Sequence, residues 1–512
     1  MFLQHRKQSS AFERHTMTGA NFTGLLLVAG LMHSGFAMSG GQEALHTRQA
    51  HADLTIAQLS PAGATPTTST QPINEEDRLQ EAQKRLSALD LRNAYRVGPE
   101  VSKTVLEQFE LMAAHPKVRQ ALDFLKADEA RTLAEQKEIV GIPAPPFKEQ
   151  ARTRDFLKRL LAMGFGKAYA DKEGNVIAVR PGSGNGPKLV ISAHLDTVFP
   201  AETDLTIREK AGLIYAPAIG DDTRGLAELL SMARALNATD IKTIGDIWFV
   251  ATVGEEGLGD LRGVKALLRD HKDIDGFITI DGLRPERITY IAVGSRRYRV
   301  TFKGPGGHSF SAFGRPSAIN AMGRAITKIA DLRTPSDPKT TFNVGTALGG
   351  TSVTSIAEMA ALELDLRSVG MQQLLDVENA AMKAINEAVG EENARWDSKG
   401  ITLDIKLVGD RPGGAQRRDA PIIQVAVLAL RAIGLEPTLE QPGGTDANAP
   451  ISMGIPAMAV GRGGLNGNMH STEEWFNPKD AYLGPQKTLL TLLALVGIDG
   501  VSKPVLTRLA PK

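Results

Sequence analysis

The sequence predicts an α/β catalytic fold that is interrupted by a second, smaller α+β domain. From Gly141 onward, short strand-like segments alternate with helical ones, as they do in α/β proteins. Several of these segments are nearly continuous apolar runs, which is typical of central strands covered on both faces. Between residues 289 and about 412 apolar and polar residues alternate instead, which favours an antiparallel sheet with helices on one face.

The N-terminus has the features of an export signal. Basic residues precede the apolar stretch 22–32, which is too short for a comfortable membrane span, and the small residues Gly35 and Ala37 fit the usual cleavage pattern. We therefore expect 1–37 to be a signal peptide and the mature protein to be periplasmic or secreted. An N-terminal membrane anchor, or a true start at Met17, would explain the same residues.

The rest of the chain divides into a linker, a helical preface and the main domain. Residues 38–75 are rich in Ser, Thr, Gln, Pro and Gly, which indicates a flexible linker. Residues 76–129 are charged and have a helical pattern. The catalytic domain is expected to occupy 130–297 and 413–505, on either side of an insertion at 298–412.

Five segments are expected to form the central strands, namely 174–180, 188–196, 246–254, 276–282 and 456–461. In the insertion we expect a helix over 317–332 and a strand over 359–368.

Composition limits the chemistry that is open to the protein. The 512 residues are 42% apolar and 5% aromatic, as in an ordinary globular protein with substantial cores. The 59 basic residues balance 58 acidic ones, so no global field favours nucleic acid or an anionic membrane. There is no cysteine, so a bound metal must be held by histidine and carboxylates. After the signal, no segment is long and apolar enough for stable membrane insertion.

Polar residues gather at the ends of the predicted strands and in two further loops: His194, Asp196, Asp221, Asp222, Glu255, Glu256, Asp281 and His470. In open α/β sheets, ligands bind beyond the carboxyl ends of the strands, so these positions can converge. Each has an ordinary alternative. Asp221 and Asp222 fit a helix N-cap, Asp281 fits a plain turn, and His194 with Asp196 fits a local hydrogen bond. Their joint occurrence favours a functional site.

In order, the motifs HLD, GDDTRG, GEEG, IDG, GGHS and HST resemble those of metallopeptidase family 20. This family of co-catalytic zinc exopeptidases and deacylases includes peptidase T, carboxypeptidase G, acetylornithine deacetylase and succinyl-diaminopimelate desuccinylase. The similarity covers roughly residues 130–505. It implies a zinc-exopeptidase-like α/β catalytic domain with an inserted α+β, ferredoxin-like dimerisation domain.

The resemblance implies a site for two zinc ions, with Co²⁺ or Mn²⁺ as substitutes. Asp221 would bridge the two ions, His194 and Asp281 would bind one, and Glu256 and His470 would bind the other. Two metals about 3.5–4 Å apart share the work of activating a water and polarising the scissile carbonyl.

Three further residues are implied to assist the reaction. Glu255 would take the proton of the water and pass it to the leaving amine. Asp196, on the same strand face as His194, would orient the imidazole. His308 in GPGGHSF corresponds to a histidine that polarises the substrate carbonyl, often across a dimer interface; an exposed loop histidine is the alternative.

The implied substrate contacts are Arg367, Thr354 and Gly444. Arg367 corresponds to an arginine that binds a substrate carboxylate, although a surface salt bridge would also explain it. Thr354 stands where many relatives have asparagine, and Thr223 stands where lysine is common, which leaves the substrate details open. Gly444 belongs to GGTDAN, which resembles a substrate-facing loop of peptidase T.

These features together favour a homodimeric zinc aminopeptidase for short peptides. An N-acyl-amino-acid deacylase or carboxypeptidase of the same family is the alternative, because the HSTEEW form occurs broadly among its members. From another class, a catalytically silent binding protein on this fold remains open, although the complete ligand set argues against it.

Overall fold

The computed structural model describes residues 100–439 and 442–510. The predicted signal peptide, the predicted linker and the first part of the helical preface lie outside these residues. Within the described residues, no helix has both the length and the apolar character that crossing a bilayer requires.

A seven-stranded mixed sheet forms the centre of the catalytic domain, in the order β1-β2-β6-β3-β7-β17-β8. Its strands are β1 (Tyr169–Ala170), β2 (Val176–Arg180), β3 (Lys188–His194), β6 (Asp246–Thr252), β7 (Gly276–Ile280), β8 (Ile288–Thr289) and β17 (Ala457–Val460). The four middle strands β6, β3, β7 and β17 are parallel, and β2 and β8 run antiparallel to their neighbours. All five predicted strands are confirmed.

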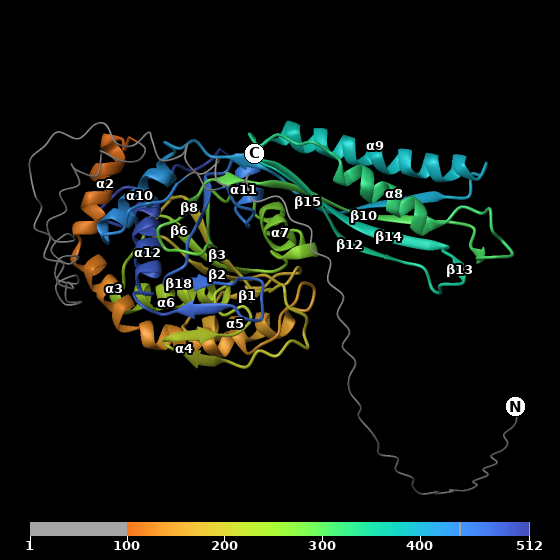
Figure 1. Ribbon diagram of the computed structural model, residues 1–512. Coiled ribbons are helices and arrows are strands. Elements are labelled where there is room, and N and C mark those ends of the chain that lie inside the picture. Colours follow the sequence, from red (N-terminus) through yellow and green to blue (C-terminus); the bar gives the residue numbers. More distant parts are fainter. Residues whose placement is uncertain (1–99, 440–441, 511–512) are drawn as a thin grey trace, which may run out of the picture. The chain divides into compact units, whose positions relative to one another are not determined.

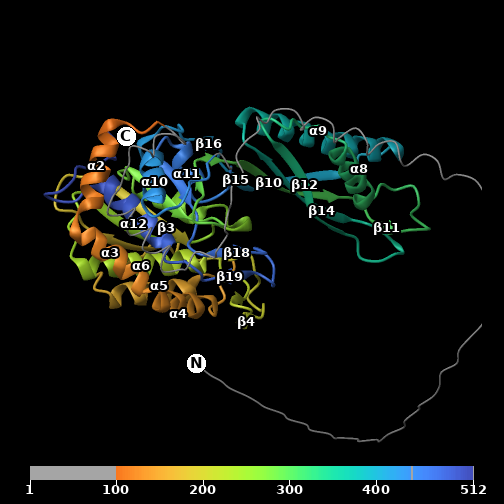
Figure 2. The same ribbon diagram turned by 60° about the vertical axis from the view of Figure 1, so that its left-hand side comes forward.

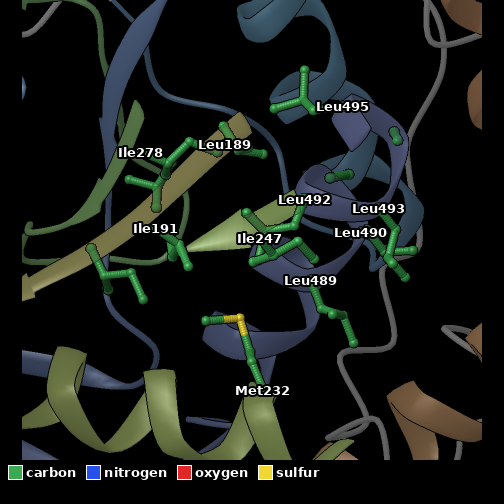
Figure 3. Close-up of a cluster of buried hydrophobic side chains, with 14 of the residues drawn as sticks. Leu189, Ile191, Met232, Ile247, Ile278, Leu489, Leu490, Leu492, Leu493 and Leu495 are labelled. Atoms are coloured by element: carbon green, nitrogen blue, oxygen red, sulfur yellow. The ribbon is translucent and has the colours of Figure 1, made fainter. Parts of the chain in front are cut away.

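Alternate residues of each central strand enter different cores, as the two-residue period of a strand requires. Leu189 and Ile191 of β3 belong to a large core on one face, whereas Val190 belongs to a smaller core on the other. Figure 3 shows the large core, where Leu189 and Ile191 lie near Ile247 and Ile278 and near a group of leucines from α12 (Leu483–Val496). The central strands are therefore buried on both faces of the sheet.

Seven helices of the described chain contribute to the large core: α2 (Lys103–Ala114), α3 (Pro116–Ala127), α4 (Glu129–Val140), α5 (Gln150–Ala162), α6 (Thr223–Thr239), α10 (Pro421–Ala432) and α12. The smaller core receives α7 (Arg262–Asp270) and α11 (Asn448–Ser452). Helices α2 and α3 belong to the predicted preface, and Phe109 of α2 and Leu125 of α3 are fully buried in the large core. The described part of the preface is therefore part of the catalytic domain's core.

The insertion contains a four-stranded antiparallel sheet in the order β12-β14-β10-β15. Along the chain its elements are β10 (Gly294–Lys303), α8 (Ala318–Ala330), β12 (Thr340–Gly349), β14 (Met359–Ser368), α9 (Met371–Arg395) and β15 (Thr402–Arg411). Helices α8 and α9 cover one face of this sheet and share a separate core with it (Figures 1 and 2). This β-α-β-β-α-β arrangement confirms the ferredoxin-like prediction.

Further short strands lie outside these two sheets. β9 (Ile291–Ala292) pairs with β16 (Gly414–Ala415) where the chain enters and leaves the insertion. β11 (Gly307–His308) pairs with β13 (Ser355–Ile356) inside the insertion. A second four-stranded sheet, which the sequence did not predict, contains β4 (Arg208–Lys210), β5 (Leu213–Tyr215), β18 (Leu465–Gly467) and β19 (Trp475–Asn477). Its β18–β19 loop carries His470.

Candidate metal centre and active site

The carboxyl ends of the parallel strands bring the predicted ligands together. His194 is the last residue of β3, Asp281 directly follows β7, and Glu256 lies in the loop after β6. Because these strands are parallel neighbours, their ends meet at one edge of the sheet. Asp221 precedes α6 at the same place, and His470 arrives from the β18–β19 loop.

Two groups of potential metal ligands share Asp221. One group consists of His194, Asp221 and Asp281, the other of Asp221, Glu256 and His470, and within each group the ligand atoms lie within 4.8 Å of one another. His194 Nε2 is 3.0 Å from Asp221 Oδ1, and His470 Nε2 is 3.2 Å from Asp221 Oδ2. A carboxylate that offers one oxygen to each group has the geometry of a bridging ligand. Imidazole and carboxylate donors suit zinc and other first-row divalent metals, so the residues fit a two-metal site.

Asp196 holds the loop that carries the paired glutamates. Its carboxylate accepts hydrogen bonds from the backbone N–H groups of Glu255 at 3.0 Å and Glu256 at 2.8 Å. His194 Nδ1 lies 3.0 Å from the backbone oxygen of Asp196, but 3.8 Å from its carboxylate. The histidine is thus oriented by the backbone of Asp196, and an orienting role for its carboxylate stays a prediction.

Asp222 and Glu474 fix the loop of Asp221 from two sides. Asp222 is the N-cap residue of α6, but its side chain makes no capping bond. It accepts the backbone N–H of His194 at 2.9 Å instead. Glu474, from the motif HSTEEW, accepts the N–H groups of Gly220 at 2.8 Å and Asp221 at 3.0 Å. Burial raises the pKa of both Asp222 and Glu474 to about 7.

Glu255 is buried and paired with an arginine from the insertion. Its Oε1 accepts a hydrogen bond from Arg411 Nη1 at 3.1 Å, and its backbone oxygen accepts one from Arg411 Nη2. Burial raises the pKa of Glu255 well above its usual value, and Arg411 opposes this shift. A buried carboxyl group with a raised pKa beside a group of potential metal ligands is a candidate for proton transfer.

The sequence reasoning missed two buried ionisable side chains in the centre. Arg462 is fully buried and contacts Asp221, Asp222 and Asp281. Asp446 of the GGTDAN motif is 1% exposed and accepts a hydrogen bond from Thr252 Oγ1 at 2.5 Å. Arg462 stands two residues after β17, so the strand-end argument that found His194 and Asp281 would also have found Arg462.

A cavity of about 530 Å³ opens beside the ligand groups. Its wall includes Arg367 and Gly444, whose contact with substrate stays a prediction, and four arginines in all: Arg287, Arg297, Arg367 and Arg411. Arg367 is half-exposed, and its Nε lies 2.6 Å from Asp365 Oδ2. The salt bridge considered as the alternative is therefore present, although the arginine also faces the cavity.

His308 and Thr354 line a different cavity, of about 850 Å³, within the insertion. The two cavities have no lining residue in common. His308 is exposed on β11, and Thr354 lies beside it, because the backbone oxygen of Thr354 accepts the N–H of Ser309 at 2.8 Å. The structure thus keeps these two residues together but does not bring them into the ligand cavity of the same chain. Thr223 is buried and bonded to backbone oxygens, away from any substrate role.

Known proteins resemble this chain in both sequence and fold. Residues 190–494 match the model of peptidase family M20/M25/M40. A succinyl-diaminopimelate desuccinylase of Corynebacterium glutamicum is 23% identical over 338 residues, which cover 64% of this chain and 86% of the relative.

Two solved structures share the fold. The aminopeptidase PepT of Bacillus cereus superposes with a TM-score of 0.57 at 23% identity, covering 71% of this chain and 97% of that protein. The Bacillus subtilis protein YXEP, described as a dinuclear metal-binding peptidase of the M20 family, has a TM-score of 0.51 at 16% identity and covers 72% of this chain and 99% of its own. Together with the family match over more than half of the sequence, these findings lead to one conclusion: the chain belongs to peptidase family M20/M25/M40 and is a hydrolase of amide bonds.

Proposed function

We propose that the protein is a two-zinc exopeptidase that removes N-terminal residues from short peptides. The observation that carries this proposal is the sharing of Asp221 between two ligand groups, each completed by one histidine and one further carboxylate. Bound zinc ions would lower the pKa of a water and polarise the scissile carbonyl. His194 and Asp281 hold one ion in this proposal, and Glu256 and His470 hold the other.

Glu255 is the proposed general base. It lies next to Glu256 in the chain and is buried. Glu255 also forms a third group of potential ligands with His194 and Glu256, but the two groups that share Asp221 are complete without it. In this role it takes a proton from the attacking water and gives it to the leaving amine. Arg411 holds this residue through one hydrogen bond to its carboxylate and one to its backbone oxygen.

The arginine-rich wall supports a small substrate with a free carboxylate. Among the described residues, and apart from the carboxylates near the metal centre, the acidic residue lining the cavity is Asp365, which pairs with both Arg297 and Arg367. A short peptide can place its C-terminus against this wall. So can an N-acyl amino acid. Among the residues that the structure describes, no further carboxylate lines the cavity to meet a substrate amine, which favours a deacylase or carboxypeptidase as the second candidate.

A substrate panel separates these candidates. It should contain di- and tripeptides and N-acyl amino acids, each with free and with blocked ends. Cleavage that requires a free amine supports the aminopeptidase, and cleavage that requires only a free carboxylate supports the second candidate. Stoichiometric metal without turnover of any member would favour a silent binding protein instead.

A homodimer with shared sites is the second part of the proposal. His308 and Thr354 lie outside the ligand cavity of their own chain, and β12 is an edge strand of the inserted sheet. Large apolar side chains near them are exposed, namely Phe310 (87%), Phe313 (79%), Leu348 (75%) and Val353 (98%). Apolar surface of this kind commonly marks a protein interface. A second copy would cover it and bring His308 to the neighbouring site.

Export remains a proposal that depends on the N-terminal sequence alone. The basic residues, the apolar stretch 22–32 and the small residues before Met38 support a cleaved signal. Sequencing the N-terminus of the protein purified from its native cells tests this: a start near Met38 supports export to the periplasm or medium, and an intact N-terminus refutes cleavage.

A further inference from the structure

One buried cation lies inside the acidic cluster and has no part in the proposed reaction. The guanidinium of Arg462 is fully buried. Its Nη2 donates to Asp221 Oδ1 at 2.6 Å and to Asp281 Oδ1 at 2.9 Å. Its Nε donates to Asp222 Oδ1 at 2.6 Å. One side chain therefore joins three carboxylates, two of which are proposed metal ligands.

These contacts fall on one side of the centre. Asp221 Oδ1, which Arg462 contacts, also faces His194 at 3.0 Å, whereas Asp221 Oδ2 faces His470 at 3.2 Å. Among the described hydrogen bonds of Arg462, none reaches Glu256 or His470. The arginine thus shares oxygen atoms with the His194–Asp281 group and not with the other.

Buried carboxylates are costly unless a cation compensates them. Arg462 provides that compensation permanently, because a guanidinium does not lose its proton in proteins. A divalent metal held by His194, Asp221 and Asp281 would bind two of the carboxylates that Arg462 contacts and would meet this fixed positive charge. The arginine and the metal are therefore alternative, mutually repelling partners of the same carboxylates.

We propose that Arg462 is an internal counter-ion that keeps the acidic cluster assembled without metal and weakens metal binding at the His194–Asp281 site. The two sites then fill in order, with the Glu256–His470 site first. This inference rests on the proposed two-metal function and adds the order of loading to it.

The sign of one mutational effect tests the inference. A residue that only orients a metal ligand from outside typically contributes about 10–100-fold to metal affinity, so its removal weakens binding. Arg462→Met should do the opposite. Zinc titration of chelator-stripped protein, followed by calorimetry and metal counting, should show the weaker site tightened by about tenfold or more. Arg462→Lys keeps the charge but loses the planar guanidinium fork, so its zinc affinity at this site should lie between those of wild type and Arg462→Met.

Thermal melting gives a second readout that is independent of activity. Without metal, Arg462→Met should melt below wild type, because three carboxylates lose their counter-ion, and its rise in Tm on adding zinc should exceed that of wild type. Arg234→Met is the matched control. Arg234 is also a buried arginine between two acids, Asp128 at 2.6 Å and Glu135 at 2.7 Å, but it contacts no proposed ligand. The substitution Arg234→Met should lower Tm while leaving both zinc affinities unchanged.

Unchanged or weaker zinc binding at the second site of Arg462→Met would overturn the inference while leaving the two-metal function intact. If Arg462→Met does not fold without metal, zinc affinity is compared between Arg462→Lys and wild type instead. A zinc affinity of the second site in Arg462→Lys that is no higher than in wild type would also overturn the inference. Wild-type protein that binds no zinc at all would refute the proposed function itself, and the inference with it.

Discussion

Arg411, the last residue of the inserted sheet, donates hydrogen bonds to both the carboxylate and the backbone oxygen of Glu255. The end of β15 also contacts the loop after Glu256, because the Asp410 N–H donates a hydrogen bond to Asp260 Oδ1 at 2.8 Å. The insertion therefore contributes directly to the position of the proposed general base.

Glu255→Gln should lower turnover by about 10²-fold or more while the protein still binds two zinc ions, because an amide cannot accept the proton. Turnover and metal content measured on the same preparation check this. Glu256→Gln is the comparison, and it should lose metal as well as activity. Loss of one zinc from Glu255→Gln would instead assign the ligand role to Glu255.

Arg411→Met should move the acidic limb of the kcat/KM profile to higher pH. Burial raises the pKa of Glu255 and Arg411 opposes that shift, so removing the guanidinium raises the pKa further. A base acts only when deprotonated, and activity then begins at a higher pH. Arg367→Met is the control, because Arg367 lines the same cavity. This substitution should raise KM for substrates with a free carboxylate without moving the acidic limb of the profile. An unmoved limb in Arg411→Met would contradict the assigned role.

Asp446→Asn should remove a pH dependence of stability. Burial raises the pKa of Asp446 from 3.8 to about 7, although the hydrogen bond from Thr252 opposes the shift. Because the folded-state pKa is raised, the protonated group contributes stability that is complete below the unfolded pKa and is lost as pH rises through about 7. In the presence of a chelator, the Tm of Asp446→Asn should therefore rise relative to the Tm of wild type as the pH increases from 3.8 to about 7. Parallel Tm curves would show that Asp446 does not titrate there.

Mixing two inactive variants tests the shared site of the proposed dimer. His308→Ala should lower turnover by on the order of 10²–10³-fold, because a donor to the developing negative charge is lost. Random mixing with Glu255→Gln subunits makes half of the dimers mixed, and each mixed dimer holds one complete site if His308 acts across the interface. Activity of about a quarter of wild type is expected.

The control for this mixing is direct detection of mixed dimers, for example with two affinity tags. Mixed dimers without regained activity would show that His308 works within its own chain or not at all. A monomeric active enzyme would exclude the shared site.

The central strands were predictable because buried parallel strands are continuous apolar runs, and the strand-end argument then found His194, Glu256 and Asp281. Contacts between distant residues were not predictable. Arg462 and Asp222 are 240 positions apart, and Glu474 and Gly220 are 254 apart, so nothing local marks either pair. Isolated charged residues after strands are common, and only the fold shows which of them are buried.

The unpredicted four-stranded sheet illustrates a different limit. β4 is three exposed residues and β5 is three residues with one buried, so neither has enough apolar pattern to be recognised. The preface residues have a clear helical pattern, but the pattern of an amphipathic helix does not show which surface its apolar face packs against. That α2 and α3 enter the core of the catalytic domain became visible only in the structure.

The central claim is that Asp221 bridges two metals, and zinc anomalous scattering from crystals of the zinc-loaded protein tests it most directly. Two peaks about 3.5–4 Å apart are expected on either side of Asp221, one bound by His194 and Asp281 and the other by Glu256 and His470. A single peak that persists as the zinc concentration is raised, or peaks at other residues, would contradict the claim.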